Sequence, residues 1–304
     1  SVLCADRSAR GAALSIAVAQ EPSAGTSDAA KRRRWLRRYG LAAAGGAIVV
    51  AWILIAIFAT WLAPYPYAQV DVTKRLLPPS ATYWLGTDLL GRDVFSRLLV
   101  GARISLIAGI VVVVIGGAVG TLIGGIAAYV GGKAEEWMMR ATDLVMCFPP
   151  IILAMAIAAA LGIGVTNTIF AMLVVWWPKF ARLARSLVLV QRNQEYVEAA
   201  HVMGYGPARI LLRHIAPNAV GPLVVLLTLD VGTAILTFAG LNFLGLGVIP
   251  PTPEWGQMVS EGRELVEQWW VATFPGIAIL TVVIGFNFLG DGIRDWLDPK
   301  SRRR

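Results

Sequence analysis

Histidine and cysteine, the usual catalytic bases, nucleophiles and metal ligands, are scarce in this chain of 304 residues, and their positions exclude most enzyme classes. Its two histidines, His201 and His214, lie in one polar segment, and its two cysteines, Cys4 and Cys147, lie far from them in sequence. This spacing matches no metal-ligand pattern. The sequence contains no G-x-x-x-x-G-K-[ST] phosphate-binding loop, so nothing in it predicts ATP hydrolysis by this chain. We therefore expect no catalytic residue and no metal site.

Asp230 is the one charged residue in the apolar stretch 220–246. If a helix begins near Val220, Asp230 lies about 15 Å along it, at ~1.5 Å per residue, close to the middle of a bilayer. A lone carboxylate at that depth is costly and needs a watery cavity or a partner, for which Lys179 is a candidate. Two interpretations stay open: Asp230 serves helix packing, hydrogen-bonded or protonated by desolvation, or it lines a pathway and meets a passing positive charge.

The polar, basic segment 191–219 separates two apolar runs and carries the most informative pattern in the chain. Glu198, Ala199 and Ala200 are followed four residues later by Gly204, and Pro217 lies thirteen residues beyond that glycine. We expect Ala199 and Ala200 to leave a smooth surface that another protein can approach closely. The alternative is an ordinary amphipathic connecting loop.

Local residue preferences predict two short helices in this segment. Residues 192–203 are good helix formers without proline, and Gly204 suits the left-handed position that follows a helix. Gly206 and Pro207 favour the start of a second helix, since proline is tolerated in a first turn. Pro217 is predicted to end that helix.

Composition places the chain among membrane proteins. It is 57% hydrophobic and 15% charged, with a mean hydropathy of +0.65, unlike an ordinary soluble domain. A membrane-spanning helix needs about 20 apolar residues. Six regions qualify, which predicts an all-α fold with six spans at residues 41–62, 104–130, 141–161, 168–189, 220–246 and 269–290.

The distribution of Lys and Arg predicts the orientation of these spans. Residues 31–38 carry six basic residues next to the first span, which favours a cytoplasmic position. Six spans then place the chain's other end and the segment 191–219 on the same side. Segment 248–268 carries four Glu against one Arg and is predicted outside. The net charge of +8 follows from this topology and does not indicate nucleic-acid binding.

The expected domain organisation has three parts. Residues 1–38 form a cytoplasmic tail that is mostly disordered, because its first thirty residues are rich in Ala, Ser and Gly. This stretch does not resemble a signal peptide, since its basic block follows the weak apolar run. Residues 39–292 form the membrane domain, and residues 293–304 form a second cytoplasmic tail.

Three glycines at a spacing of four, Gly116, Gly120 and Gly124, share one face of the second predicted span. Small residues at this spacing let two helices approach closely in lipid. They do not indicate a dinucleotide loop, because their surroundings are Val and Ile and no strand flanks them. The neighbouring helix could belong to this chain or to a partner.

Several longer motifs carry a resemblance to a known family. They are residues 84–97 (WLGTDLLGRDVFSR), Asp143 with 148–150 (FPP), 213–218 (RHIAPN), 243–256 (FLGLGVIPPTPEWG) and 286–299 (FNFLGDGIRDWLDP). Together with Glu198, Ala199, Ala200, Gly204 and Pro217, they resemble the inner-membrane permease subunits of ATP-binding-cassette importers, of the C type found in oligopeptide and dipeptide transport. The resemblance covers residues 35–299.

This resemblance implies the type I importer permease fold and a permease subunit in the bacterial inner membrane. The subunit would form half of a peptide pathway with a homologous permease, two ATPase subunits and an extracytoplasmic binding protein. The segment 191–219 would be the coupling loop that docks into the ATPase. This chain would bind no cofactor itself, and ATP and Mg²⁺ would lie on the partner subunits.

Other functions remain as alternatives. Similar permeases carry nickel, haem or glutathione, and two departures from the family pattern leave the solute open: Thr237-Phe238-Ala239 replaces a usual Glu, and Lys179 replaces a smaller or neutral residue. A secondary transporter would show paired broken helices in two halves, and no such repeat is evident. An intramembrane hydrolase needs a nucleophile and a base in the bilayer, whereas both histidines lie in a loop.

Overall fold

The computed structural model describes the backbone of residues 28–297 and the side chains of residues 40–297. All the regular elements in that part of the chain are helices. The only β-type pairing among the described residues is an isolated bridge between Thr87 and Asp93. The elements are α2 (Asp28–Leu62), η1 (Val72–Lys74), α3 (Val94–Val130), α4 (Gly132–Met146), α5 (Pro150–Leu161), α6 (Val165–Arg192), α7 (Glu195–Val202), α8 (Pro207–Ile210), η2 (Leu211–Ile215), α9 (Ala216–Phe243), α10 (Trp255–Gly262) and α11 (Trp270–Leu297).

The inner boundaries of both predicted tails fall inside helices. Residues 28–38 belong to helix α2, and α11 extends through Leu297. Residues 1–27, which include Cys4 and most of the stretch predicted to be disordered, lie outside the described residues, as do residues 298–304. Contacts divide the chain into residues 1–40 and residues 41–304, and the account below concerns the second unit.

Among the described residues, four helices are long and apolar enough to cross a membrane: Gly40–Leu62, Val94–Val130, Pro207–Phe243 and Trp270–Leu297. The pair α4 and α5 passes the same criteria together as one broken span. The fourth predicted span, residues 168–189, coincides with α6, which is not among these candidates and whose second half carries Lys179, Arg182, Arg185 and Arg192. All six predicted regions are therefore helical, and their apolar lengths suit a membrane protein.

Residues 141–161 do not form one straight span as predicted. Helix α4 ends at Met146, α5 begins at Pro150, and the two are bent by 86°. The residue before a proline avoids the helical conformation, and proline cannot donate to the preceding turn. Pro149 and Pro150 therefore end one helix and start another. Two ion pairs hold α4 against α6. Arg182 of α6 lies 2.7 Å from Asp143 of α4, and Arg185 of α6 lies 2.6 Å from Glu135 of α4.

The glycine stripe of α3 packs against α6 of the same chain, which settles the choice left open by the sequence. A Cβ on Gly116 would lie 3.2 Å from the Cβ of Trp176, and one on Gly120 would lie 2.8 Å from that of Phe180. A Cβ on Gly124 would overlap the carbonyl group of Ala181. The contacts advance in the same direction along both helices, so α3 and α6 run parallel.

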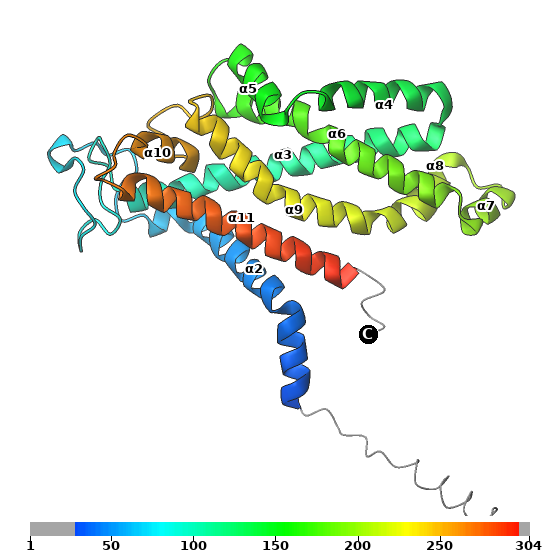
Figure 1. Cartoon of the computed structure of the whole chain (residues 1–304), viewed down its shortest axis with the longest axis horizontal. Helices are drawn as coiled ribbons and strands as arrows, with labels where there is room; N and C mark the ends of the chain where they lie inside the picture. Colours follow the sequence, from blue (N-terminus) through cyan, green and yellow to red (C-terminus); the bar gives the residue numbers. More distant parts are fainter. Residues whose placement is uncertain (1–27, 298–304) are drawn as a thin grey trace, which may run out of the picture. The chain divides into compact units, whose positions relative to one another are not determined.

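Helices α9 and α11 complete the bundle with alternating directions. Gly109 faces Ile235 and Gly117 faces Leu227, so α9 runs antiparallel to α3. In α11, Gly290 faces Leu229 of α9. Helices α3 and α6 are the second and fourth predicted spans and run parallel, and α9, the fifth, runs antiparallel to them, as successive membrane crossings require. Figure 1 shows these helices side by side, with α7 and α8 at one end and α10 at the other.

A buried charge cluster, formed by Asp88, Arg92, Arg97 and Glu261, closes the α10 end of the bundle. Arg92 Nε lies 2.7 Å from Asp88 Oδ2, and Arg97 Nη1 pairs with Asp88 and lies 2.6 Å from Glu261 Oε2. Two carboxylates therefore balance two guanidinium groups, which is the condition for keeping charges inside a protein. The 84–97 motif is thus explained by structure: it ties the loop before α3 to α10.

Glu254 caps α10 from a fully buried position beside this cluster. Its side chain accepts hydrogen bonds from Ser105 Oγ (2.9 Å) and from the backbone N–H of Gln257 (3.0 Å). Burial raises the pKa of this carboxyl group to about 7, and the hydrogen bonds oppose that rise. Trp255 Nε1 donates to the Leu98 carbonyl at 3.0 Å, which fixes α10 against α3.

The close approach of α3 and α6 yields a test with adjacent residues. We expect Gly124→Ala to destabilise the protein by about 1–3 kcal/mol, because overpacking forces the helices apart. Gly125→Ala is the matched control, since nothing lies within 4 Å of a Cβ at that position. Thermal unfolding midpoints of the purified variants measure the difference. Equal midpoints for both variants would contradict the packing described here.

Candidate coupling loop and buried ion pair

The two short helices predicted in the segment 191–219 are present between α6 and α9, with one change in the first of them. We call α7, α8 and the turn between them the bracket. The prediction placed a single helix over residues 192–203, but α6 continues to Arg192 and α7 begins at Glu195. Asn193 and Gln194 separate the two. The bracket therefore starts with a turn at the end of a membrane-facing helix, and α7 forms its own short segment of eight residues.

Gly204 makes the bend between α7 and α8, as predicted. Its φ is 78°, in the left-handed region that favours glycine. The N–H of Tyr205 donates to the Ala200 carbonyl at 3.2 Å, and the N–H of Gly204 donates to the His201 carbonyl at 2.9 Å. These two bonds form a Schellman motif, which satisfies the free carbonyls at a helix end. Pro207 then occupies the first turn of α8, also as predicted.

Pro217 does not end the second helix, so that prediction is wrong. The helix continues from Pro207 to Phe243 through a π-helical turn at Leu211–Ile215. In an α-helix the proline ring collides with the carbonyl four residues earlier. The wider π turn ends at Ile215, two residues before Pro217, and relieves this collision. Asn218 Nδ2 also donates to the His214 carbonyl at 3.0 Å, which satisfies an acceptor in the widened turn.

A small apolar core seats the bracket on the ends of α3 and α6. Val197 and Ala200 of α7 and Ile210 and Ile215 of the following helix are fully buried, and they cluster with Ala128 of α3 and Val188 of α6. Ala200 therefore cannot form part of a smooth contact surface, contrary to the prediction. Its methyl group fits the core, where a larger side chain would separate the bracket from the bundle.

Polar contacts lock the bracket in the same position. Arg192 Nη1 donates to the Ala128 carbonyl at 3.0 Å. Asn218 Nδ2 also lies 3.2 Å from the Tyr196 hydroxyl, joining α7 to α9, and Tyr205 stacks on His214 with ring centroids 5.6 Å apart. Asn218 and His214 stood in the 213–218 motif, but their partners are distant in sequence and could not be assigned from it.

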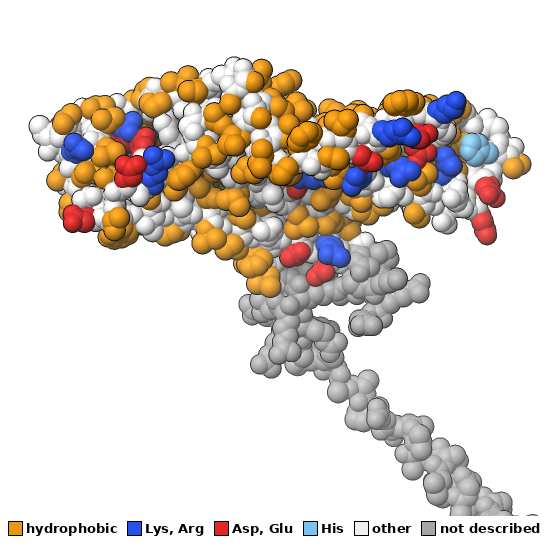
Figure 2. Space-filling model, turned by 45° about the horizontal axis from the view of Figure 1, so that its top comes forward, with side chains coloured by type: hydrophobic (Ala, Val, Ile, Leu, Met, Phe, Trp, Pro, Cys, Tyr) orange, Lys and Arg blue, Asp and Glu red, His pale blue; other side chains and the backbone are white. Residues whose placement is uncertain are grey.

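The outer face of α7 is open to a partner. Glu198 and Ala199 are exposed, and the side chains of Val202 and Met203 are 89% and 63% exposed. Histidine occurs only in this bracket, and Figure 2 shows it at the end of the molecule on the right, next to carboxylates. An apolar tip beside acidic side chains, on a bracket fixed from behind, provides a surface for docking another protein.

Asp230 forms an ion pair with Lys179, as predicted. Asp230 Oδ2 lies 2.5 Å from Lys179 Nζ and accepts a hydrogen bond from Trp176 Nε1 at 2.7 Å. The Lys179 ammonium also lies 4.0 Å from the centre of the Trp176 ring, which gives a cation–π contact. The sequence did not identify Trp176, because nothing local distinguishes it from the adjacent Trp177.

The pair is only partly enclosed. The side chain of Asp230 is 9% exposed and that of Lys179 is 32% exposed. Asp230 therefore joins α9 to α6, and its charge is balanced within the chain, while Lys179 keeps one side open. Any solute meeting this site would meet the ammonium group first.

Comparison with protein families agrees with these features. The model of the binding-protein-dependent transport system inner membrane component matches residues 120–303. The N-terminal transmembrane domain of oligopeptide transport permease C matches residues 30–79. The chain belongs to the family of binding-protein-dependent inner-membrane transport components. It is thus a membrane-embedded permease subunit of an ABC transporter, and ATP is hydrolysed by separate subunits of such systems.

Curated relatives match over most of their length. The chain is 46% identical over 255 residues to the probable D,D-dipeptide transport system permease protein DdpC of Escherichia coli (strain K12), covering 84% of this chain and 86% of the relative. It is 44% identical over 268 residues to the dipeptide transport system permease protein DppC of Alkalihalophilus pseudofirmus, covering 88% of each chain. It is 47% identical over 271 residues to the glutathione transport system permease protein GsiD of Shigella sonnei, covering 88% of this chain and 89% of the relative.

A solved structure shares the fold. A chain from the inward-facing MetNI methionine ABC transporter aligns with a TM-score of 0.56 and 21% identity, covering 66% of this permease and 96% of that chain. The similarity supports the type I importer permease fold, as the sequence predicted. Figure 2 shows hydrophobic side chains over much of the face in view, with one group of charged side chains on the left and another that extends from the middle to the right end.

The Asp230–Lys179 pair can be tested by a double-mutant cycle. We expect Asp230→Asn alone to lower stability, because it leaves a largely buried ammonium without its counter-ion. Adding Lys179→Gln should recover part of the loss, with a coupling free energy of about 1–3 kcal/mol. Thermal unfolding of the purified single and double variants measures this coupling. Strictly additive losses would contradict the ion pair.

Proposed function

We propose that this permease forms half of the translocation pathway of an ATP-driven importer of short peptides. Membership of the binding-protein-dependent family supports the importer class. The three relatives described above are named for dipeptide, D,D-dipeptide and glutathione transport, and all three solutes are short peptides. None of these names supports nickel or haem, so a short peptide is the solute class that we infer.

The complex we propose contains this permease, a homologous permease, two ATPase subunits and an extracytoplasmic binding protein. ATP and Mg²⁺ belong to the ATPase subunits. The bracket of α7 and α8 contacts one ATPase through its exposed face, where Glu198, Ala199 and the tip at Val202 and Met203 lie. Its buried core on α3 and α6 supports this role, because a partner's movement reaches the membrane helices only through a packed element.

The orientation we propose places the bracket, residues 31–38 and the end of α11 in the cytoplasm. The basic residues next to these segments support it. The bundle is consistent with it, because Ala42 packs on Gly292 and Leu297 reaches Gly221, which brings both ends of the membrane domain to the end occupied by the bracket. The 63–93 loop and α10 then lie on the extracytoplasmic side.

We assign Lys179 and Asp230 to the pathway as a pair. The partly open ammonium of Lys179 supports contact with a carboxylate of the solute, whereas Asp230 holds that ammonium in place. This reverses the role considered for Asp230 from sequence, in which its carboxylate would meet a positive charge directly.

The bracket gives the experiment that tests the proposed coupling. A side chain at Gly204 costs about 1 kcal/mol or more in the left-handed conformation, although nothing lies within 4 Å of it. Gly204→Val should therefore leave membrane insertion intact while reducing peptide uptake and ATPase co-purification. Gly206→Ala is the control, because Gly206 has an ordinary φ of −67° and equally open surroundings. Full transport by Gly204→Val would refute the coupling role of the bend.

A further inference from the structure

Three basic residues of α6 follow one another at a spacing of three, and each forms an ion pair with a carboxylate of a neighbouring helix. The pairs are Lys179–Asp230, Arg182–Asp143 and Arg185–Glu135. We call these three pairs the charge ladder. Residues three apart on a helix are neighbours, with about 5–6 Å between their Cβ atoms. The charge ladder therefore continues the Lys179–Asp230 pair in even steps along α6 toward the bracket.

The basic member of each pair keeps part of its surface free. The side chains of Lys179, Arg182 and Arg185 are 32%, 52% and 41% exposed. Their partners on α9 and α4 hold them in place, but ion pairs that are this open contribute little stability. Exchange of one carboxylate for another therefore costs little free energy, and each pair can accept a carboxylate from outside the chain.

The charge ladder lies beside a helix that is long and apolar enough to cross a membrane. Gly124 of α3 faces Ala181 of α6, and α3 continues without a charged residue to Val130. Arg182 directly follows Ala181, so it is level with the apolar part of α3. A charged side chain at such a level is costly in lipid and faces water or protein. We therefore expect the exposed side of the charge ladder to face a water-filled space.

A cavity of about 400 Å³ adjoins the charge ladder on its α4 side. Figure 1 shows α4 lying along the second half of α6. The charged residues that line the cavity are Glu135, Glu136, Arg140 and Asp143 of α4 and Arg185 of α6. The four α4 residues are spaced so that they share one face of the helix. One polar helix face and two pairs of the charge ladder therefore surround the same space.

A different face of α4 is apolar. Trp137 and Leu144 are 69% and 66% exposed, and each directly follows a charged residue that lines the cavity. A helix with one polar and one apolar face lies between two environments. In a membrane protein these environments are water and lipid, which supports a water-filled cavity on the polar side of α4.

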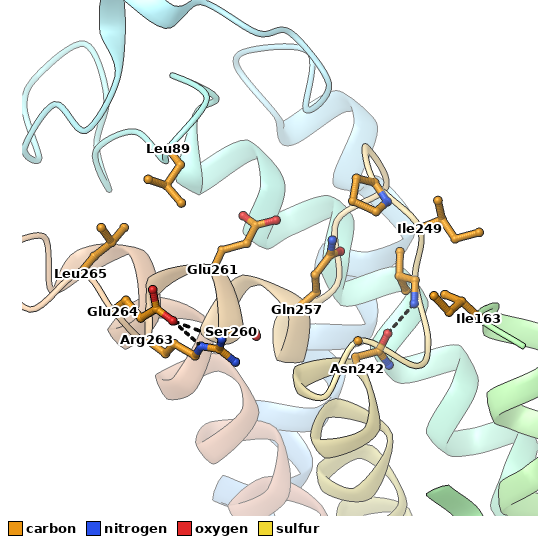
Figure 3. Close-up of a pocket in the computed structure, with 13 residues that line it drawn as sticks. Leu89, Ile163, Asn242, Ile249, Gln257, Ser260, Glu261, Arg263, Glu264 and Leu265 are labelled. Atoms are coloured by element: carbon orange, nitrogen blue, oxygen red, sulfur yellow. Dashed lines mark hydrogen bonds and ion pairs between the residues drawn. The ribbon is translucent and has the colours of Figure 1, made fainter. Parts of the chain in front are cut away.

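A second cavity, of about 500 Å³ at the α10 end of the bundle, differs in where its charges lie. Figure 3 shows Glu261, Arg263 and Glu264 on α10 and the segment that follows it. None of these three residues belongs to a helix that could cross a membrane. Water solvates such charges at little cost, so this cavity gives no indication of a route for the solute.

We propose that the charge ladder forms the cytoplasmic half of the solute route, in which the carboxylate of a short peptide passes from Lys179 to Arg182 and then to Arg185. Each pair holds both signs, so the ammonium group of the peptide can pair with the carboxylate that the chain releases. An extended dipeptide spans at most about 7 Å, close to the spacing of successive pairs, so its two ends can contact two pairs at once. The inference rests on the proposed function and adds the residues that guide the solute beyond Lys179.

Cysteine labelling tests whether the polar face of α4 meets water. A charged methanethiosulfonate reagent is added to the complete importer in nanodiscs without ATP, in a chain that carries Cys4→Ser and Cys147→Ser. We expect Asp143→Cys to react at least about tenfold faster than Leu144→Cys, because a thiol ionises in water and not in lipid. The two positions are adjacent and both exposed, so they form a matched pair. Equal rates, or a faster reaction of Leu144→Cys, overturn the proposal.

Uptake of two peptides tests contact with the carboxylate of the solute. Proteoliposomes with the complete importer and its binding protein take up alanyl-alanine or alanyl-alanine amide, which lacks the terminal carboxylate. Arg182→Gln should lower the ratio of the two initial rates, acid to amide, about tenfold, the effect of losing one hydrogen bond to a charged group. Arg182→Lys should retain most of the ratio. Lys133→Gln is the control, because Lys133 is an exposed residue of α4 that does not line the cavity.

The possible outcomes have separate meanings. A structural role of Arg182 lowers the uptake of both peptides equally, so an unchanged ratio in Arg182→Gln overturns the proposal and leaves the proposed function standing. If Arg182→Gln loses the homologous permease during purification, the arginine belongs to an interface between subunits and the proposal also fails. If the wild type takes up neither peptide, the proposed function itself fails.

Discussion

Close packing between α3 and α6 is the interaction on which the rest of the structure depends. Glycines on α3 let its backbone lie against the Trp176–Ala181 region of α6, and small residues make this contact possible in lipid, where no hydrophobic force drives helices together. The same seam continues to Ala128 and Val188, where the bracket is seated. One interface therefore positions both the membrane helices and the bracket, which we propose contacts the ATPase, so we expect movement of the bracket to displace α3 and α6 together.

Two sets of charged side chains inside the bundle are balanced within the chain. Asp230 is paired with Lys179, and two arginines balance Asp88 and Glu261. Burial of such pairs adds little net stability, but removal of one member is costly. Their value lies in position: the first pair connects α6 to α9, and the second connects α3 to α10. Both places join helices that alternating access would have to move as units.

Sequence patterns correctly predicted the features that depend on local residue preferences. Gly204 was identified because a left-handed bend needs glycine, and the helical regions followed from apolar length. The patterns failed where tertiary structure or an uncommon turn decides. Pro217 was read as a helix end because the rule for proline does not foresee a π turn. The burial of Ala200 and the partnership of Trp176 with Asp230 arise from residues distant in sequence. The break at Pro149 is different, because the two adjacent prolines are visible in the sequence. The long apolar stretch around them nevertheless favoured the prediction of a single span.

The central claim is that the bracket, and not another exposed surface, contacts the ATPase. Val202 on the bracket and Val266 after α10 are almost equally exposed, at 89% and 87%. A photocrosslinking amino acid placed at each position in turn therefore tests which of the two surfaces contacts the ATPase, without a difference in exposure. In membranes containing the complete importer, the account predicts that a crosslinker at position 202 captures the ATPase subunit, identified by its phosphate-loop peptide in mass spectra, and that one at position 266 does not. Capture of the ATPase at position 266, or its absence at position 202 in an importer that transports peptide, would contradict the account.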